Sequence, residues 1–81
     1  MALEKPSSHT TVLDVTGLQC PLPVLKTQKA LKPLESGEIL EVISTDPMAA
    51  IDIPHFCTEH GHTFLGQTPE NDAIRFKVRK K

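Results

Sequence analysis

The alternation of strand-like and helix-like segments constrains the fold of this 81-residue chain more than any other feature of its sequence. Residues 11–17, TVLDVTG, and 38–45, EILEVIST, are short apolar runs with β-branched residues, which are typical of strands. Between them, PLPVLKTQKALKPL at 21–34 has the period of a helix, with its lysines opposite its apolar residues. This order predicts a right-handed strand–helix–strand unit with parallel strands.

The next segment predicts a second helix, over residues 46–61. Asp46 stands where an N-cap is expected and Pro47 at the first helical position, and both residue types are favourable there. Pro54 lies inside the pattern and has no N–H to donate to the preceding turn. We therefore expect the helix to kink or to restart after Asp52.

Two further strands complete the predicted sheet. Residues 62–68 and 73–79 are strand-like, and the turn-forming residues PEND join them as a hairpin. The last strand alternates apolar with basic residues, so we expect one of its faces to pack against the core and the other to face solvent. The order β-α-β-α-β-β predicts an α/β (α+β) two-layer sandwich, a four-stranded mixed sheet with both helices on one face. We expect a flexible N-terminus over 1–10 and a single domain over 11–81.

Composition argues against several classes of function. The formal net charge is −1, and the chain has three Phe but no Trp or Tyr. We therefore expect neither stable nucleic-acid binding through stacked bases nor attraction to a membrane surface. The sequence shows no secretion signal or transmembrane run, and its two cysteines fit no disulfide framework. These features predict a cytoplasmic monomer with reduced thiols.

Cys20 lies between the first predicted strand and the first predicted helix. Open α/β sheets place their reaction sites at this carboxyl edge. The positive end of the helix dipole favours a thiolate, and it would also favour a persulfide anion on the same sulfur. Pro21 and Pro23 fit the first helical turn, whose amides have no intrahelical partner, and they predict a rigid frame around the cysteine. Because two amides are missing, we expect only a moderate lowering of the Cys20 pKa.

Three other residues are candidates to support Cys20. Gly17 ends the first strand, and Gln19 directly precedes the cysteine. Asp46 ends the second strand, so it should reach the same edge of the sheet. We expect its main role to be structural, as the N-cap of the second helix.

Leu22 and Leu25 lie away from the apolar face of the first predicted helix, close to its lysines. Apolar residues beside a reactive cysteine, with Lys26 and Lys29 around them, predict a docking patch for a partner protein. The alternative is that Leu22 packs locally against a loop.

The run GLQCPLPVLK, residues 17–26, resembles the signature of the TusA/SirA family of small sulfur-carrier proteins, whose first helix starts with a Cys-Pro-x-Pro motif. TDP at 45–47 is similar to the family's second helix start, and DIPHFC at 52–57 to a stretch typical of its TusA branch. The closing IRFKVRKK resembles the family's last strand. The resemblance covers roughly residues 11–80.

The resemblance implies the two-layer fold and a persulfide carried on Cys20. It implies a sulfur donor of the cysteine desulfurase or rhodanese-like kind, and a downstream acceptor protein in tRNA thiolation, molybdenum cofactor assembly or dissimilatory sulfur oxidation. The protein would then be a sulfurtransferase that moves one sulfur per loading, with no metal or organic cofactor. Many family members have arginine where this chain has Gln19, so one cation that would stabilise the thiolate is absent.

The second cysteine permits a redox or metal-binding function instead. Helix geometry places Cys57 about 16 Å from Cys20, whereas a disulfide needs Cα atoms within about 7 Å, so we expect a core thiol. The segment HFCTEHGH nevertheless has the composition of a metal site. Cys57, His60 and His62 are its candidate ligands, while His55 lies on another side of the helix.

The basic C-terminal end permits a third function, as an RNA-binding module. A solvated strand face explains the same charges without RNA, and stacking aromatics are absent. The residues concerned are Arg75, Lys77, Arg79, Lys80 and Lys81.

Overall fold

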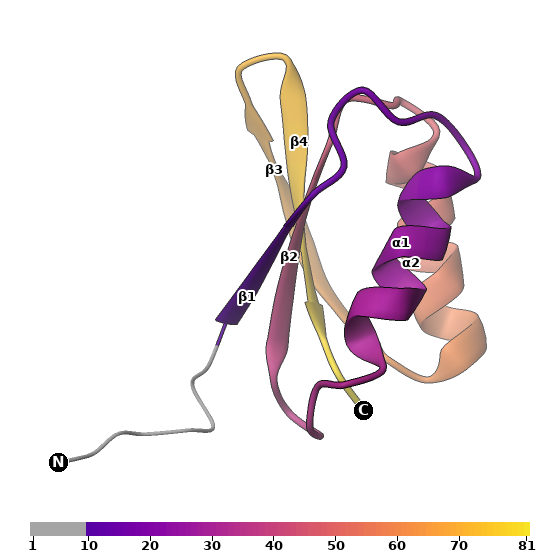
Figure 1. Ribbon diagram of the computed structural model, residues 1–81, viewed down its shortest axis with the longest axis vertical. Helices are drawn as coiled ribbons and strands as arrows, with labels where there is room; N and C mark the ends of the chain where they lie inside the picture. Colours follow the sequence, from indigo (N-terminus) through magenta and orange to yellow (C-terminus); the bar gives the residue numbers. More distant parts are fainter. Residues whose placement is uncertain (1–9) are drawn as a thin grey trace, which may run out of the picture.

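The predicted strands and helices form two layers, a sheet and a pair of helices that cover one of its faces (Figure 1). The computed structural model describes residues 10–81. It confirms the predicted fold class and element order. Most of the predicted N-terminal segment lies outside the described residues, but Thr10 already belongs to the first strand. The elements are β1 (Thr10–Asp14), α1 (Leu22–Leu31), β2 (Ile39–Ser44), α2 (Ala49–His60), β3 (Thr63–Glu70) and β4 (Ala73–Arg79).

The sheet has the strand order β1-β2-β4-β3. β1 and β2 are parallel neighbours, as predicted for the first crossover, and β4 is antiparallel to both β2 and β3. β3 therefore does not neighbour β2, because β4 lies between them. The side chains explain this order: Phe76 and Val78 of β4 are completely buried, whereas β3 contains Gly66 and Pro69, which suit an edge strand.

The core lies between the sheet and the two helices. Alternate residues of β2 and β4 face the helices, and their outward neighbours are in contact with solvent. Cys57 is 1% exposed, so the predicted core thiol is confirmed. The buried apolar residues are Val15, Leu31, Leu40, Val42, Ala49, Ile53, Phe56, Cys57, Phe76 and Val78.

α1 is shorter at both ends than the segment 21–34 predicted as helical. It ends at Leu31, although Lys32 still has helical backbone angles, because Pro33 has no N–H with which to continue the intrahelical hydrogen bonds. Leu34 still packs against the core from outside the helix. The ammonium group of Lys80 donates a 2.7 Å hydrogen bond to the carbonyl of Leu31 and so satisfies an acceptor at the helix end.

α2 begins at Ala49, three residues after Asp46. The prediction that Asp46 is its N-cap is wrong in position, since Met48 occupies that place, but the side chain of Asp46 still accepts a hydrogen bond from the amide of Met48. The helix is also continuous across Pro54, so the predicted restart after Asp52 is wrong. Packing of the apolar face of α2 on the sheet compensates for one missing intrahelical bond.

Candidate functional site

The candidate site lies at the carboxyl ends of β1 and β2, where the loops that lead into α1 and α2 meet (Figure 1). Two hydrogen bonds join these loops to the sheet edge. The N–H of Val15 donates to the carbonyl of Ile43 at 2.9 Å. The N–H of Gly17, which has φ 83°, donates to Oγ1 of Thr45 at 2.9 Å. Gly17 thus turns the chain at the strand exit, where its positive φ is unfavourable for other residues.

Asp46 connects the entrances of the two helices. Its Oδ2 accepts a 2.6 Å hydrogen bond from the amide of Cys20, and its Oδ1 accepts a 3.1 Å bond from the amide of Met48. Its own N–H donates to Oγ of Ser44. The prediction that Asp46 reaches the edge occupied by Cys20 is confirmed, and its side chain binds the cysteine backbone directly.

The two prolines occupy different environments around α1. Pro21 is exposed and directly precedes the helix, and the Cys20–Pro21 peptide bond is cis. Pro23 is buried in the first turn. The carbonyl of Gln19 accepts a 2.8 Å bond from the N–H of Leu22. The exposed side chain of Gln19 lies outside the groove described below.

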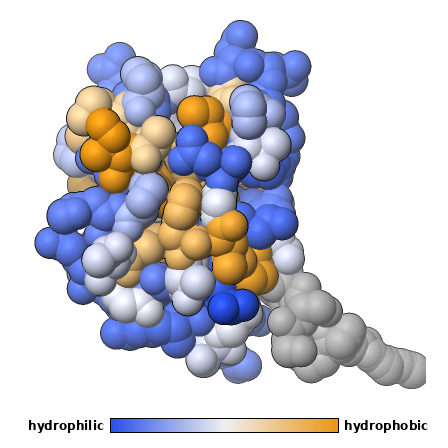
Figure 2. Space-filling view, turned by 180° about the vertical axis from the view of Figure 1, so that it is seen from behind, coloured by the Kyte–Doolittle hydropathy of each residue, from blue (hydrophilic) through white to orange (hydrophobic). Residues whose placement is uncertain are grey.

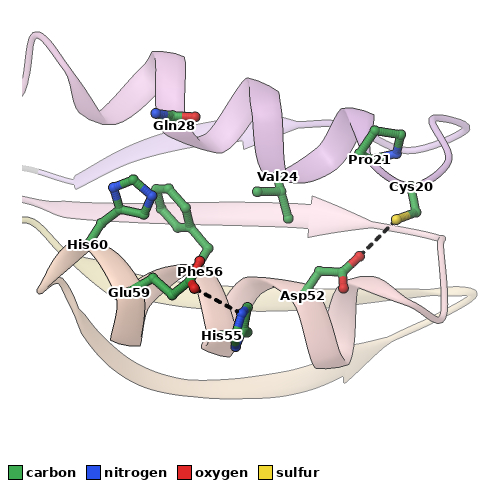
Figure 3. A pocket seen from close by; sticks show the side chains of 9 residues that line it. All are labelled: Cys20, Pro21, Val24, Gln28, Asp52, His55, Phe56, Glu59 and His60. Atoms are coloured by element: carbon green, nitrogen blue, oxygen red, sulfur yellow. Dashed lines mark hydrogen bonds and ion pairs between the residues drawn. The ribbon is translucent and has the colours of Figure 1, made fainter.

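The thiol of Cys20 is exposed and donates a 2.9 Å hydrogen bond to Oδ2 of Asp52 in the first turn of α2 (Figure 3). This bond is the main reason why the pKa of Cys20 is raised, and desolvation and the charges of Asp52 and Asp46 add to the effect. The predicted lowering of the Cys20 pKa by the helix dipole is therefore wrong for the free thiol. α1 starts only at Leu22, and a carboxylate in direct contact outweighs a partial charge two residues away.

Sequence reasoning missed Asp52 as a site residue. A signal was present, because Asp52 lies in the first turn of a helix that starts at the same sheet edge as Cys20.

A groove of about 290 Å³ runs from Cys20 between α1 and α2 (Figure 3). Val24 and Phe56 form apolar parts of its walls, and His60 lies toward its far end. Nε2 of His55 lies 3.4 Å from Oε2 of Glu59 along the α2 side. No lysine or arginine of the described chain lines this groove, so its fixed charges are carboxylates.

Leu22 and Leu25 are 43% and 52% exposed, and Lys26 and Lys29 are exposed as well. The predicted placement of these four residues on the surface is confirmed. Sequence reasoning missed Met48 and Ile51, which are exposed at the start of α2. Hydrophobic side chains also reach the surface elsewhere, between hydrophilic ones (Figure 2).

The structure gives little support to the other candidate functions, which are metal binding, redox chemistry at Cys57 and RNA binding. Within residues 10–81, no three His, Cys, Asp or Glu side chains gather into a group that could hold a metal ion. Burial raises the pKa of Cys57 to about 11. Arg75 forms ion pairs with Glu41 at 2.7 Å and with Glu70 at 2.9 Å, so its charge is compensated within the sheet. None of the helices in residues 10–81 has the length and apolar character needed to span a membrane.

The fold and the site together define a small two-layer α/β domain that presents one exposed thiol at a helix entrance. A family model described as "Sulfurtransferase TusA" matches residues 11–80. The chain belongs to this family. It is 45% identical to the "Sulfur carrier protein TusA" of Pseudomonas entomophila (strain L48) over 73 residues. The matched region covers 90% of this chain and 91% of that protein. It is 43% identical to the protein of the same name from Pseudomonas putida (strain GB-1) over 70 residues. The matched region covers 86% of this chain and 88% of that protein.

Proposed function

We propose that this protein is a sulfur carrier that holds sulfane sulfur as a persulfide on Cys20 and relays it between proteins. The observation that carries the proposal is the placement of Cys20: its thiol is exposed, while the other cysteine is buried. An exposed sulfur beside an open groove is accessible to the reactive cysteine of another protein. Family membership supports the same function.

The donor is a cysteine desulfurase or a rhodanese-like protein, and the acceptor is a further protein of a sulfur relay. The destination of the sulfur is tRNA thiolation, molybdenum cofactor assembly or dissimilatory sulfur oxidation. No metal or organic cofactor takes part, because the sulfur is bound covalently to Cys20. The protein acts as a monomer in the cytoplasm, where thiols are kept reduced.

Gly17, Gln19, Pro21, Pro23 and Asp46 position the thiol in this proposal. Asp46 does so through its hydrogen bond to the Cys20 amide, and Pro23 does so from its buried place in the first helical turn. With the backbone of Cys20 held, the attacking sulfur keeps a defined direction when a partner approaches.

The partner docks on the exposed residues around the thiol. Leu22 and Leu25 supply apolar contact area, and Lys26 and Lys29 supply charge that orients the partner. Seating the partner directly over Cys20 keeps the mobile sulfur away from solvent during transfer.

Mass spectrometry of the intact protein tests the function. After incubation with a cysteine desulfurase and cysteine, we expect an added mass of about 32 Da, one sulfur atom, that a reductant removes. The addition should be absent in Cys20→Ser and present in Cys57→Ser, since Cys57 is buried. Loading that depends on Cys57, or no loading of the folded wild-type protein by any donor of these two classes, would contradict the proposal.

A further inference from the structure

Cys20 is held by two carboxylates that act on different atoms. Asp46 accepts the hydrogen bond from its backbone amide at 2.6 Å, and Asp52 accepts the hydrogen bond from its thiol at 2.9 Å. The thiol bond needs the proton on Sγ, because a thiolate has no hydrogen to donate. The geometry therefore favours the neutral thiol, which is the form that does not attack other sulfur atoms.

Within residues 10–81, no lysine or arginine lines the groove beside these carboxylates. The charged or titratable groups that line the groove are Asp52, His55, Glu59 and His60 of α2, and His55 lies beside Glu59. α1 contributes Val24 and Gln28, and Pro21 lies just before the helix; none of these three residues carries a charge. From the link between β2 and α2, Asp46 adds another negative charge beside Cys20. The raised pKa of Cys20 agrees with this arrangement.

We propose that Asp52 restrains Cys20: its carboxylate keeps the proton on Sγ in the free carrier, and a docked partner starts sulfur transfer by breaking the Sγ–Oδ2 hydrogen bond. This inference rests on the proposed function, because it assigns Asp52 a role in the same transfer. It makes the transfer selective, since a small persulfide or oxidant brings no group that replaces the thiol on Asp52 and so reacts slowly, whereas a partner protein can place its own donor group there.

The transfer step balances without an oxidant or reductant. Sγ of Cys20 attacks the outer sulfur of a donor persulfide, R–S–SH. The S–S bond of the donor breaks as the new S–S bond on Cys20 forms, and the electron pair of the broken bond leaves on the donor's inner sulfur. The proton that Asp52 held on Sγ ends on that sulfur. The products are Cys20–S–SH and R–SH.

The full-length variant Asp52→Asn tests the restraint, because it keeps the size of the side chain but removes its charge. Glu59→Gln is the matched control, since it removes one carboxylate from the same groove without contacting Sγ. The first measurement is the rate of alkylation of the sulfur-free protein by iodoacetamide between pH 6 and pH 10, followed by intact mass. We expect Asp52→Asn to react at least threefold faster than wild type at pH 7, with its half-maximal rate at lower pH, and Glu59→Gln to stay within twofold of wild type.

The second measurement compares two sulfur donors, cysteine persulfide and a cysteine desulfurase supplied with cysteine. Asp52→Asn should load at least threefold faster from cysteine persulfide but within twofold of wild type from the desulfurase. An unchanged alkylation profile in Asp52→Asn overturns the restraint, and an equal acceleration with both donors overturns its release by the partner. Asp52→Ser, which also removes the charge, decides the matter in the same way if Asp52→Asn fails to fold. Failure of the wild-type protein to load, with a shifted alkylation profile in Asp52→Asn, would reject the carrier function while the restraint stands.

Discussion

Oδ2 of Asp46 lies 2.6 Å from the amide nitrogen of Cys20, which is 26 residues away in the chain. A hydrogen bond to a charged group contributes more than a neutral one, and this one joins the two loops at the carboxyl edge of the sheet. It couples the position of the reactive residue to the stability of the domain.

Replacing Asp46 by alanine should therefore lower the free energy of unfolding by about 1–2 kcal/mol, because the amides of Cys20 and Met48 lose their acceptor. Urea denaturation followed by circular dichroism measures the change. Asp14→Ala is the control, since within residues 10–81 the side chain of Asp14 accepts hydrogen bonds only from Thr16 in its own turn. Equal losses in both variants would mean that the link between the two loops adds no stability of its own.

The docking surface is tested by replacing Leu22 and Leu25 with serine. Both side chains are exposed, so folding and alkylation of Cys20 by iodoacetamide should be nearly unchanged. Transfer from a cysteine desulfurase should fall at least several-fold, as expected from a loss of about 1–2 kcal/mol of interface burial.

A matched control exists on the other side of the sheet. Val12 and Leu65 are 55% and 41% exposed, and Val12 is in register with Glu41 on the face away from the helices. Their replacement by serine should leave desulfurase transfer unchanged. Similar losses in the two double variants would place the partner's contact elsewhere.

The carboxylates near Cys20 should discriminate between small reagents by charge. Iodoacetate and iodoacetamide share a leaving group and differ by one negative charge, so Asp46 and Asp52 repel only the first. We expect the ratio of the iodoacetamide rate to the iodoacetate rate to be about three- to tenfold higher for the protein than for a short cysteine peptide at low salt. Half-molar sodium chloride should bring the ratio close to that of the peptide. A ratio that is insensitive to both salt and Asp52→Asn would contradict this explanation.

Cys57 should make stability depend on alkaline pH. Burial raises its pKa from an ordinary 9.0 to about 11, so the folded state keeps a proton that the unfolded state releases between these values. The contribution of the buried Cys57 thiol to the free energy of unfolding is therefore complete below pH 9, and it is lost as the pH rises toward 11. At roughly 1.4 kcal/mol per pH unit, its upper bound is about 3 kcal/mol.

The free energy of unfolding of wild type and Cys57→Ala, measured at pH 8 and pH 10.5, isolates this effect from other titrations. The difference between the two proteins should shrink as the pH rises. A constant difference would show that the thiol ionises equally in both states.

The sequence predicted the fold because local patterns determine it. The alternation in β4 and the apolar face of α2 are visible residue by residue, and Gly17 and the proline motif locate the site at a sheet edge. The strand order was not predictable from local patterns. β4 lies next to β2 because its side chains Phe76 and Val78 are completely buried in the centre of the sheet, and this burial is visible only in the folded structure.

The electrostatics of the site were predicted less well. The helix dipole is a property of α1 alone, and reasoning from it gave the wrong sign for the Cys20 pKa. The deciding contact comes from Asp52, 32 positions further along the chain. Such a contact depends on how α1 and α2 pack against each other, which no local pattern specifies.

The place of β4 in the sheet also determines when this protein can fold during synthesis. β2 and β3 share no ladder, and both pair with β4. Until Ala73–Arg79 has left the ribosome, the sheet consists of β1 with β2 and a separate β3, and the core lacks the buried side chains of Phe76 and Val78. Cys20 is synthesised early, but we expect its contacts with Asp46 and Asp52 to become stable only when the last strand completes the core, so a nascent chain stalled before residue 73 should load poorly.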